Sequence, residues 1–351
     1  MIIARAPFRI TLGGGGTDLP SFYGLHGGFI FAMGIDKYVN VLLNPSTVDR
    51  RIRLQYLQSE IVQRVEQLRH PLAREAMRFH GIETAMEITS VADLPARAGV
   101  GSSGSYLVAM LAALNAYTRR PVSPDLLAEQ ACHIEIDVLK EPVGKQDQYM
   151  AAFGGLRILE IDREGKVETK TIDISPSSLH EFIGNTHIYY TGVERSASAV
   201  LESQHTAAKE SSHADHATVV DSLLRIKDLG YRILEAVKSE NFDEYGRLLD
   251  VHWQNKKRMS GKISLTFVDE IYETAKSEYG VLGGKIIGAG GGGFLMLYTP
   301  HNHRRLNDFM LRNGMRQLHY SVEYQGAKIV ADLRGSHEAA VNHKADLCAH
   351  S

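Results

Sequence analysis

The sequence has few of the residues and patterns that mark specialised protein classes. Its 351 residues include 2 cysteines and 1 tryptophan, and the formal net charge is −2. No apolar run approaches the roughly 18 residues of a membrane-spanning helix, and the N-terminal segment lacks the charged start and apolar core of a signal peptide. No basic block favours nucleic acid or a membrane surface. We therefore expect a cytoplasmic monomer or homodimer with small-molecule partners.

The two cysteines exclude two further classes. Cys132 lies in a helical pattern and Cys348 in a polar tail. Cysteines so few and so far apart form neither a disulfide framework nor a metal-site spacing. We predict two free thiols.

Strand and helix patterns alternate along the chain, without repeats. Residues 29–43 are rich in β-branched and aromatic residues, which is typical of strands. Residues 106–117 are apolar on nearly all faces and predict a buried helix. Ser123 followed by Pro124 is a helix start signal, and we expect that helix to end near Pro142.

The composition changes in the middle of the chain. A polar stretch at 168–178 suggests the connection between two lobes, so we predict domains over 1–180 and 181–334. Two long helical patterns, a short helix near Ile271 and several strand patterns predict that the second lobe is α+β. Residues 335–351 have no periodicity and are expected to form a loosely ordered tail.

Three glycine-rich stretches interrupt these patterns, and two common nucleotide motifs do not account for them. None supplies the lysine that a Walker ATPase loop requires after its glycines. Residues 288–293 match the letters of the dinucleotide fingerprint, but residues 294–298 read as a strand. No helix N-terminus would then receive a pyrophosphate, so the sequence disfavours a dinucleotide site.

The stretch RAGVGSSGS at 97–105 differs because it leads directly into the buried helix. Glycines allow the backbone to approach a ligand closely, and the amides and dipole at a helix start attract anions. Serine hydroxyls there can donate to phosphate oxygens or bind Mg²⁺. The same residue types also cap helices, so these residues alone leave a phosphate loop and a simple cap equally open.

The surrounding motifs favour the phosphate loop. LPARAGVGSSGS (94–105) closely resembles the second motif of the GHMP small-molecule kinases, the family of galactokinase, homoserine kinase, mevalonate kinase and phosphomevalonate kinase. RITLGGGGTDLP (9–20) resembles the first motif of that family, and KIIGAGGGG (285–293) resembles the third. The resemblance covers residues 1 to about 335. It implies a two-lobe α+β fold, with an N-terminal lobe like domain 2 of ribosomal protein S5, a ferredoxin-like C-terminal lobe and an active site between them.

The resemblance also implies ATP and Mg²⁺ as cofactors, and roles for particular residues. Asp147 resembles the catalytic carboxylate, which would accept or orient the proton of the attacking hydroxyl. Arg9 occupies the position of the basic residue beside it and would stabilise charge on the transferring phosphoryl group. Ser103 and Glu135 look like the magnesium ligands. The loop residues that would bind the nucleotide are Gly99, Val100, Gly101, Ser102, Ser103, Gly104 and Ser105.

The first motif carries the expected sugar contacts. Asp18 matches the sugar-binding aspartate of galactokinases and could accept two hydroxyl hydrogen bonds, although an aspartate before Pro20 could equally be a turn residue. Gly15 and Gly16 stand where galactokinases have Glu and His, which disfavours galactose and favours a larger or more anionic substrate. The other residues expected at the substrate are Thr17, Gly290 and Gly291.

Within the family, the combination FRITLGGGGTDLP, GIDKYV and YTGVERSASAVLESQ resembles the branch of the D-glycero-D-manno-heptose 7-phosphate kinases and the kinase part of bifunctional fucokinases. The implied reaction is transfer of the ATP γ-phosphoryl group to the anomeric hydroxyl of the heptose 7-phosphate. The product, the 1,7-bisphosphate, would serve nucleotide-activated heptose synthesis. A fucokinase-like or other sugar 1-kinase remains an alternative, as does a non-catalytic sugar or nucleotide sensor, although the retained catalytic residues argue against a sensor.

A substrate that already carries a phosphate needs a second cationic site. Arg195 and Ser196, together with Lys37, are the residues that we expect to hold this phosphate, although arginine on an exposed helix face is common. His252, Trp253, Lys256 and Lys257 form a further polar cluster, which helical spacing explains as well as substrate contact does. This cluster receives no predicted role.

Overall fold

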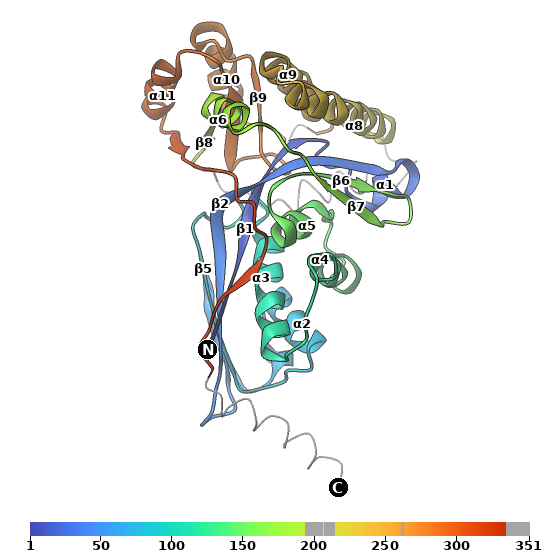
Figure 1. The fold of residues 1–351 in the computed structure, drawn as a ribbon, viewed down its shortest axis with the longest axis vertical. Coiled ribbons are helices and arrows are strands. Elements are labelled where there is room, and N and C mark those ends of the chain that lie inside the picture. Colours follow the sequence, from blue (N-terminus) through green and yellow to red (C-terminus); the bar gives the residue numbers. More distant parts are fainter. Residues whose placement is uncertain (194–205, 207–214, 261–262, 335–351) are drawn as a thin grey trace.

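The structure, a computed structural model, describes residues 1–193, residue 206 and residues 215–260 and 263–334. These residues form two sheets with helices packed around them, which confirms the predicted two-lobe α+β fold (Figure 1). Among the helices of the described residues, none is both long enough and apolar enough to cross a membrane. The predicted tail at 335–351 lies outside the described residues.

The first sheet has eight strands, in the order β12-β1-β2-β5-β3-β4, with β6 joined to β2 and β7 joined to β6. Only the pairing of β3 with β5 is parallel, so this is not the interleaved parallel sheet of a dinucleotide-binding fold. The strands are β1 (Ile2–Gly13), β2 (Gly28–Pro45), β3 (Ile52–Gln55), β4 (Ser59–Val62), β5 (Met86–Ala92), β6 (Leu156–Ile161), β7 (Val167–Thr171) and β12 (Lys328–Asp332).

The second sheet has four strands, in the order β11-β8-β10-β9, and all its pairings are antiparallel. Its strands are β8 (Thr186–Tyr190), β9 (Gly283–Ile286), β10 (Phe294–Tyr298) and β11 (Arg316–Leu318). The helices of this half are α6 (Pro176–Asn185), α8 (His216–Lys238), α9 (Phe242–Lys257), α10 (Thr266–Tyr279) and α11 (His303–Arg312).

The long strands β1 and β2 form the centre of the first lobe. They pair antiparallel, with Ile2 opposite Leu43 and Arg9 opposite Gly34. Burial alternates at the start of β1 but becomes continuous from Ala6 onward. The change arises because α3 (Ser102–Tyr117) and α5 (Gln146–Phe153) cover this part of the strand and α8 packs across its end.

Two predicted helices are confirmed. Helix α3 is buried along most of its length, as its uniformly apolar sequence indicates. Helix α4 (Pro124–Cys132) begins as predicted, because the Ser123 hydroxyl accepts a hydrogen bond from a backbone N–H of the first turn. After α4 the chain continues as a wider π-helix, η2 (His133–Val138). This helical segment ends before Pro142, as expected. The shorter helices of this lobe are α1 (Pro20–His26), α2 (Pro71–Phe79) and the 3₁₀ turn η1 (Val65–Gln67).

The polar stretch at 168–178 runs between the lobes, since it contains the partly exposed strand β7 of the first sheet and the capped start of α6 in the second half. Two other features of the middle and end of the chain differ from expectation. The helix around Ile271 is 14 residues long rather than short. Strand β12 pairs with β1, so the domain predicted over 181–334 includes a strand of the first sheet.

The two lobes meet where α8 crosses the end of β1. A Cβ atom added to Gly13 would lie 3.0 Å from the Cα atom of Gly230. A Cβ atom added to Gly230 would lie 2.8 Å from a ring carbon of Phe29 and 3.1 Å from the backbone nitrogen of Gly14. The helix and strand backbones are therefore packed too closely for a side chain between them.

We expect Gly230→Ala to lower the free energy of unfolding by about 1–3 kcal/mol. The added methyl group overpacks this contact, and the free energy lost by overpacking exceeds the gain from alanine's higher helix propensity. Urea denaturation measures the change. Gly184→Ala in α6 is the matched control, since a Cβ atom there meets nothing within 4 Å. The control should be neutral or stabilising by up to about 1 kcal/mol. Equal stability of the two variants would contradict the close packing of α8 on β1.

Candidate active site

A cavity of about 320 Å³ lies between the lobes. The first lobe contributes β1, the glycine loop after it, the start of α3, η2 and the start of α5, and the second lobe contributes α9, β9 and the turn after β9. The predicted site residues that line the cavity are Arg9, Gly15, Gly16, Asp18, Gly99, Gly101, Ser102, Ser103, Glu135 and Asp147.

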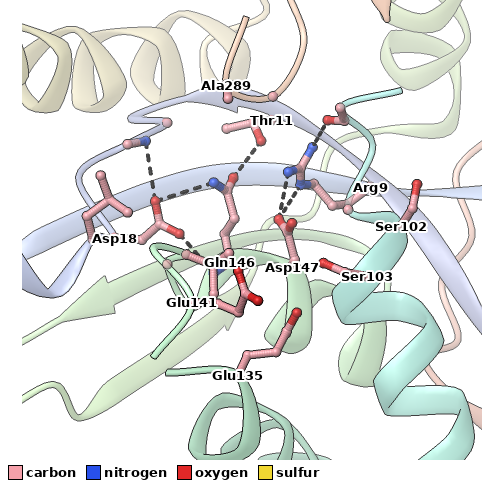
Figure 2. A pocket seen from close by; sticks show the side chains of 18 of the residues that line it. Arg9, Thr11, Asp18, Ser102, Ser103, Glu135, Glu141, Gln146, Asp147 and Ala289 are labelled. Carbon is pink, nitrogen blue, oxygen red and sulfur yellow. Dashed lines mark hydrogen bonds and ion pairs between the residues drawn. The ribbon is translucent and has the colours of Figure 1, made fainter. Parts of the chain in front are cut away.

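Arg9 and Asp147 form an ion pair at the centre of this cavity (Figure 2). The Nε and Nη2 atoms of Arg9 lie 2.8 and 2.6 Å from Oδ1 of Asp147, and Nη1 donates to the Gly99 carbonyl at 2.6 Å. Within the described part of the chain, Oδ2 of Asp147 has no hydrogen-bond partner. Arg9 is 3% exposed, so its position is fixed by its surroundings, while a free carboxylate oxygen faces the cavity.

The loop before α3 has the geometry expected of an anion cradle. Gly99 and Gly101 have φ values of 80° and 84°, which favour glycine, and Gly101 is the N-cap of a 16-residue helix. The next residue, Ser102, lines the cavity, and its Oγ atom is buried without a hydrogen-bond partner among the described residues. Free helix-start amides and an unpartnered hydroxyl together fit the oxygens of a phosphate chain.

Three residues of the predicted nucleotide loop do not line the cavity. The Ser105 hydroxyl is buried and donates to the Pro7 carbonyl at 2.8 Å. Val100 is buried, and its carbonyl accepts from the Arg9 amide at 3.1 Å. Gly104 packs against Asp147, where an added Cβ atom would lie 2.8 Å from the Asp147 Cβ. These residues fix the loop on β1 and α5. Their predicted contact with a nucleotide stays a prediction.

Glu135 lies below the loop and points toward Ser103 and Asp147 (Figure 2). It projects from the π-helix η2, a widened turn that is frequent at functional sites. Burial raises the pKa of the Glu135 carboxyl to about 7, although hydrogen bonds from Gln148 and Ser103 favour the charged form. A buried carboxylate next to a serine hydroxyl and a phosphate cradle is an oxygen donor set that fits Mg²⁺.

Asp18 belongs to a hydrogen-bonded network on the other side of the cavity (Figure 2). Its oxygens accept a hydrogen bond from the backbone N–H of Gln146 at 3.0 Å. They also accept from the side-chain Nε2 of Gln146 and from the backbone N–H of Gly16, each at 3.3 Å. The Gln146 side chain in turn accepts from the Thr11 hydroxyl at 2.6 Å. Burial raises the pKa of Asp18, and the backbone hydrogen bond from Gln146 opposes this shift. The network holds the glycine loop against α5.

The structure does not place four predicted substrate residues on the cavity lining. The Thr17 hydroxyl is buried within the glycine loop, where it lies 2.8 Å from the Gly14 carbonyl. Gly291 donates its amide to the Ile263 carbonyl at 2.7 Å, and Gly290 packs against the same residue. The ammonium group of Lys37 lies 2.9 Å from its neighbour Asp36. Arg195 and Ser196, which were also expected at the substrate, lie outside the described residues.

The cavity residues to which sequence reasoning gave no role include Gln146, His252, Lys256 and Lys285. Gln146 directly precedes Asp147, and Lys285 is the first residue of the third motif, so adjacency to these motifs was the available signal. His252 and Lys256 lie four residues apart on α9 and face the cavity from the second lobe. Their helical spacing was visible in the sequence, but the face of the helix that meets the cavity was not.

Comparison with known families agrees with this geometry. The family model described as the GHMP kinases N terminal domain matches residues 62–155, and the one described as GHMP kinases C terminal matches residues 233–307. The chain belongs to the GHMP kinases. It is therefore a phosphotransferase that acts on a hydroxyl group, and GHMP kinases use ATP as the phosphoryl donor.

Several relatives of this GHMP kinase act on sugars. It is 24% identical over 309 residues to a D-glycero-alpha-D-manno-heptose 7-phosphate kinase of Campylobacter jejuni, covering 85% of this chain and 89% of the relative. It is 25% identical over 354 residues to an L-fucokinase/L-fucose-1-P guanylyltransferase of Bacteroides fragilis, covering 90% of this chain and 36% of that protein. These similarities support a sugar kinase.

A solved structure confirms the fold of this GHMP kinase. The crystal structure of a D-glycero-D-manno-heptose 1-phosphate kinase from Bacteroides thetaiotaomicron aligns with a TM-score of 0.77 at 21% identity. The alignment covers 95% of this chain and 100% of the other. The two-lobe arrangement is thus that of GHMP kinases.

The buried carboxyl of Glu135 makes stability depend on pH. Because its folded pKa lies above the usual value, its contribution to stability is full below about pH 4.5 and is lost as the pH rises through about 7. Glu135→Gln cannot ionise, so we expect it to be more stable than the unmodified protein at pH 8 by about 1–3 kcal/mol and equally stable at about pH 4. Urea denaturation without nucleotide at the two pH values measures this difference.

The matched control is Glu164→Gln, which removes an exposed carboxylate and should leave stability unchanged at both pH values. A Glu135→Gln variant that is no more stable than the unmodified protein at pH 8 would show that Glu135 is not a desolvated carboxyl.

Proposed function

We propose that this GHMP kinase transfers the γ-phosphoryl group of ATP to the anomeric hydroxyl of D-glycero-D-manno-heptose 7-phosphate, giving the 1,7-bisphosphate. The observation that carries the proposal is the Arg9–Asp147 pair, which leaves one carboxylate oxygen free in the cavity beside the start of α3. The similarity to the heptose 7-phosphate kinase of Campylobacter jejuni supports this choice of substrate.

Asp147 would act as the base. Its Oδ2 atom accepts the proton as the anomeric oxygen bonds to the γ-phosphorus, and the bond from that phosphorus to the bridging oxygen of ATP breaks, releasing ADP. An anomeric hydroxyl is more acidic than an ordinary alcohol, so a carboxylate is an adequate base for it. Arg9 holds Oδ1 and fixes the direction in which Oδ2 points.

The start of α3 would bind the phosphates of the nucleotide. The free amides after Gly101 and the Ser102 hydroxyl would donate to phosphate oxygens, and Ser103 and Glu135 would hold Mg²⁺. When bound, the magnesium ion neutralises charge on the phosphate oxygens. The Arg9 hydrogen bond to the Gly99 carbonyl keeps this loop in register with Asp147.

The glycine loop and the Asp18 network would form the sugar side of the cavity. Asp18 and Gln146 are buried beside Asp147 and present amide and carboxylate groups to hydroxyls. Gly15 and Gly16 line the cavity without side chains, which leaves space for a seven-carbon sugar. ATP and sugar phosphates are intermediates of cytoplasmic metabolism, so we place the reaction in the cytoplasm, in the synthesis of nucleotide-activated heptose for a glycan.

A fucokinase-like activity is the second candidate. The similarity to the L-fucokinase part of the Bacteroides fragilis protein favours it, because that alignment spans 90% of this chain. The same Arg9–Asp147 pair would serve both reactions. The two candidates differ in whether the substrate carries a phosphate.

The role of Asp147 predicts the effect of Asp147→Asn. We expect kcat to fall by about a hundredfold to ten-thousandfold with a small change in KM, because the amide cannot accept the proton. Coupled ADP release with saturating ATP and Mg²⁺ measures the rate. Asp137→Asn, which changes an exposed carboxylate on η2, is the control and should retain full activity. Full activity of Asp147→Asn would exclude Asp147 as the base.

The substrate is tested by comparing D-glycero-D-manno-heptose 7-phosphate, the unphosphorylated heptose and L-fucose in the same assay. We expect kcat/KM to be at least about a hundredfold higher for the heptose 7-phosphate, because a charge-assisted phosphate contact is lost with the other two. A preference for L-fucose would replace this proposal with the fucokinase-like one.

A further inference from the structure

Three ionisable side chains of the second lobe line the cavity together with the first-lobe residues described above. His252 and Lys256 come from α9, and Lys285 comes from β9. Their exposed fractions are 1%, 5% and 2%, so all three are almost completely removed from solvent.

Among the described residues, none of these side chains has an acidic partner, and only the two lysines form hydrogen bonds. The Lys256 ammonium donates to the Gly288 carbonyl, and the Lys285 ammonium donates to the Leu12 carbonyl at 2.9 Å. No carboxylate of the described residues forms an ion pair with either lysine. Both ring nitrogens of His252 are buried without a hydrogen-bond partner among the described residues.

Other lysines of the same lobe show that this arrangement is unusual. Lys257, the neighbour of Lys256 on α9, lies 3.0 Å from Asp269, and Lys276 lies 2.9 Å from Asp250. Both are more exposed than the cavity lysines, yet both are paired. Among the described lysines of this lobe, the two most deeply buried therefore lack an ion-pair partner in the cavity.

Two buried ammonium groups without a counter-ion are unfavourable. Burial lowers the pKa of Lys256 to about 8 and lowers that of Lys285 as well. The positive charge of Arg9 adds to both shifts, and the Asp18 carboxylate only partly opposes the shift of Lys256. Each ammonium group has three N–H donors, of which one is used by a backbone carbonyl. An anion in the cavity would supply both the missing charge and the missing hydrogen-bond acceptors.

The position of the cluster indicates which anion this is. Lys285 is anchored at Leu12, directly before the glycine loop, where Gly15 and Gly16 leave the cavity open. The phosphates of the nucleotide have their own donors at the start of α3, and Arg9 is engaged with Asp147. Lys37 does not line the cavity, so it does not supply the cationic site that a phosphorylated sugar needs.

We propose that His252, Lys256 and Lys285 form an anion subsite for the phosphate group that the sugar carries before the reaction. The identity of that sugar rests on the proposed function. The subsite itself requires only a phosphate monoester, whose two negative charges match two lysines. It makes the protein select substrates that are already phosphorylated.

The test compares Lys256→Met and Lys285→Met with the unmodified protein on the heptose 7-phosphate and on the unphosphorylated heptose. We expect each variant to lose at least tenfold in kcat/KM on the phosphorylated sugar, through KM, and to change less than threefold on the other sugar. Lys257→Met on the same helix is the matched control and should keep the full preference. An unchanged preference for the phosphorylated sugar would overturn the proposal. Equal losses on both sugars would also overturn it, because they would assign the lysines to the transferred phosphoryl group.

A binding measurement separates this proposal from the choice of sugar. Thermal unfolding is followed with and without inorganic phosphate, in the presence of Mg²⁺ and a non-hydrolysable ATP analogue that fills the α3 end. We expect phosphate to raise the Tm of the unmodified protein and of Lys257→Met, and not that of Lys256→Met, Lys285→Met or the second variant Lys285→Gln.

The Tm values without phosphate also show that the variants are folded, since exchanging an unpaired buried charge for methionine should not lower them. If the unmodified protein does not turn over the heptose 7-phosphate but phosphate stabilises it through these lysines, the heptose 7-phosphate assignment fails and the subsite stands. If phosphate stabilises all variants equally, the subsite fails whatever the sugar.

Discussion

The guanidinium of Arg9 is the contact on which the whole site depends. It binds Asp147 of α5 and the Gly99 carbonyl of the loop before α3, and it projects from the central strand β1. One planar group with donors in fixed directions thus sets the relative positions of three elements that are distant in sequence. Because it is almost fully buried, the group that would move the proton and the loop that would hold the phosphates cannot shift independently.

A second constraint brings the other lobe to this contact. The backbones of Gly99 and Gly288 touch, and a Cβ atom on Gly288 would lie 2.5 Å from the Gly99 carbonyl oxygen. The loop that follows β9 therefore rests directly on the loop before α3, and no side chain separates them. This contact also sets the place of Lys256, whose ammonium group binds the Gly288 carbonyl. The position of the Lys256 ammonium group therefore depends on the packing of one glycine on another.

The sequence predicted the parts of the site that local motifs encode. Arg9, Glu135 and Asp147 meet as the motif resemblance implied, and Ser123 capped its helix as its residue type indicated. Local pattern could not show which way a hydroxyl faces, so Ser105 was expected at a nucleotide although it bonds to Pro7, 98 residues away. Nor could it show that lysines on α9 and β9 are buried together, because their burial depends on how the two lobes pack.

Strand β12 has a consequence for how the chain reaches its final form. It pairs with the beginning of β1, with Ile2 opposite Asp332, so the two partners are separated by nearly the whole chain. The edge of the first sheet that β12 covers stays open until the second lobe has been synthesised. Closing so long a loop is entropically unfavourable and slow. During synthesis the edge of β1 is thus open to pairing with another chain until β12 covers it.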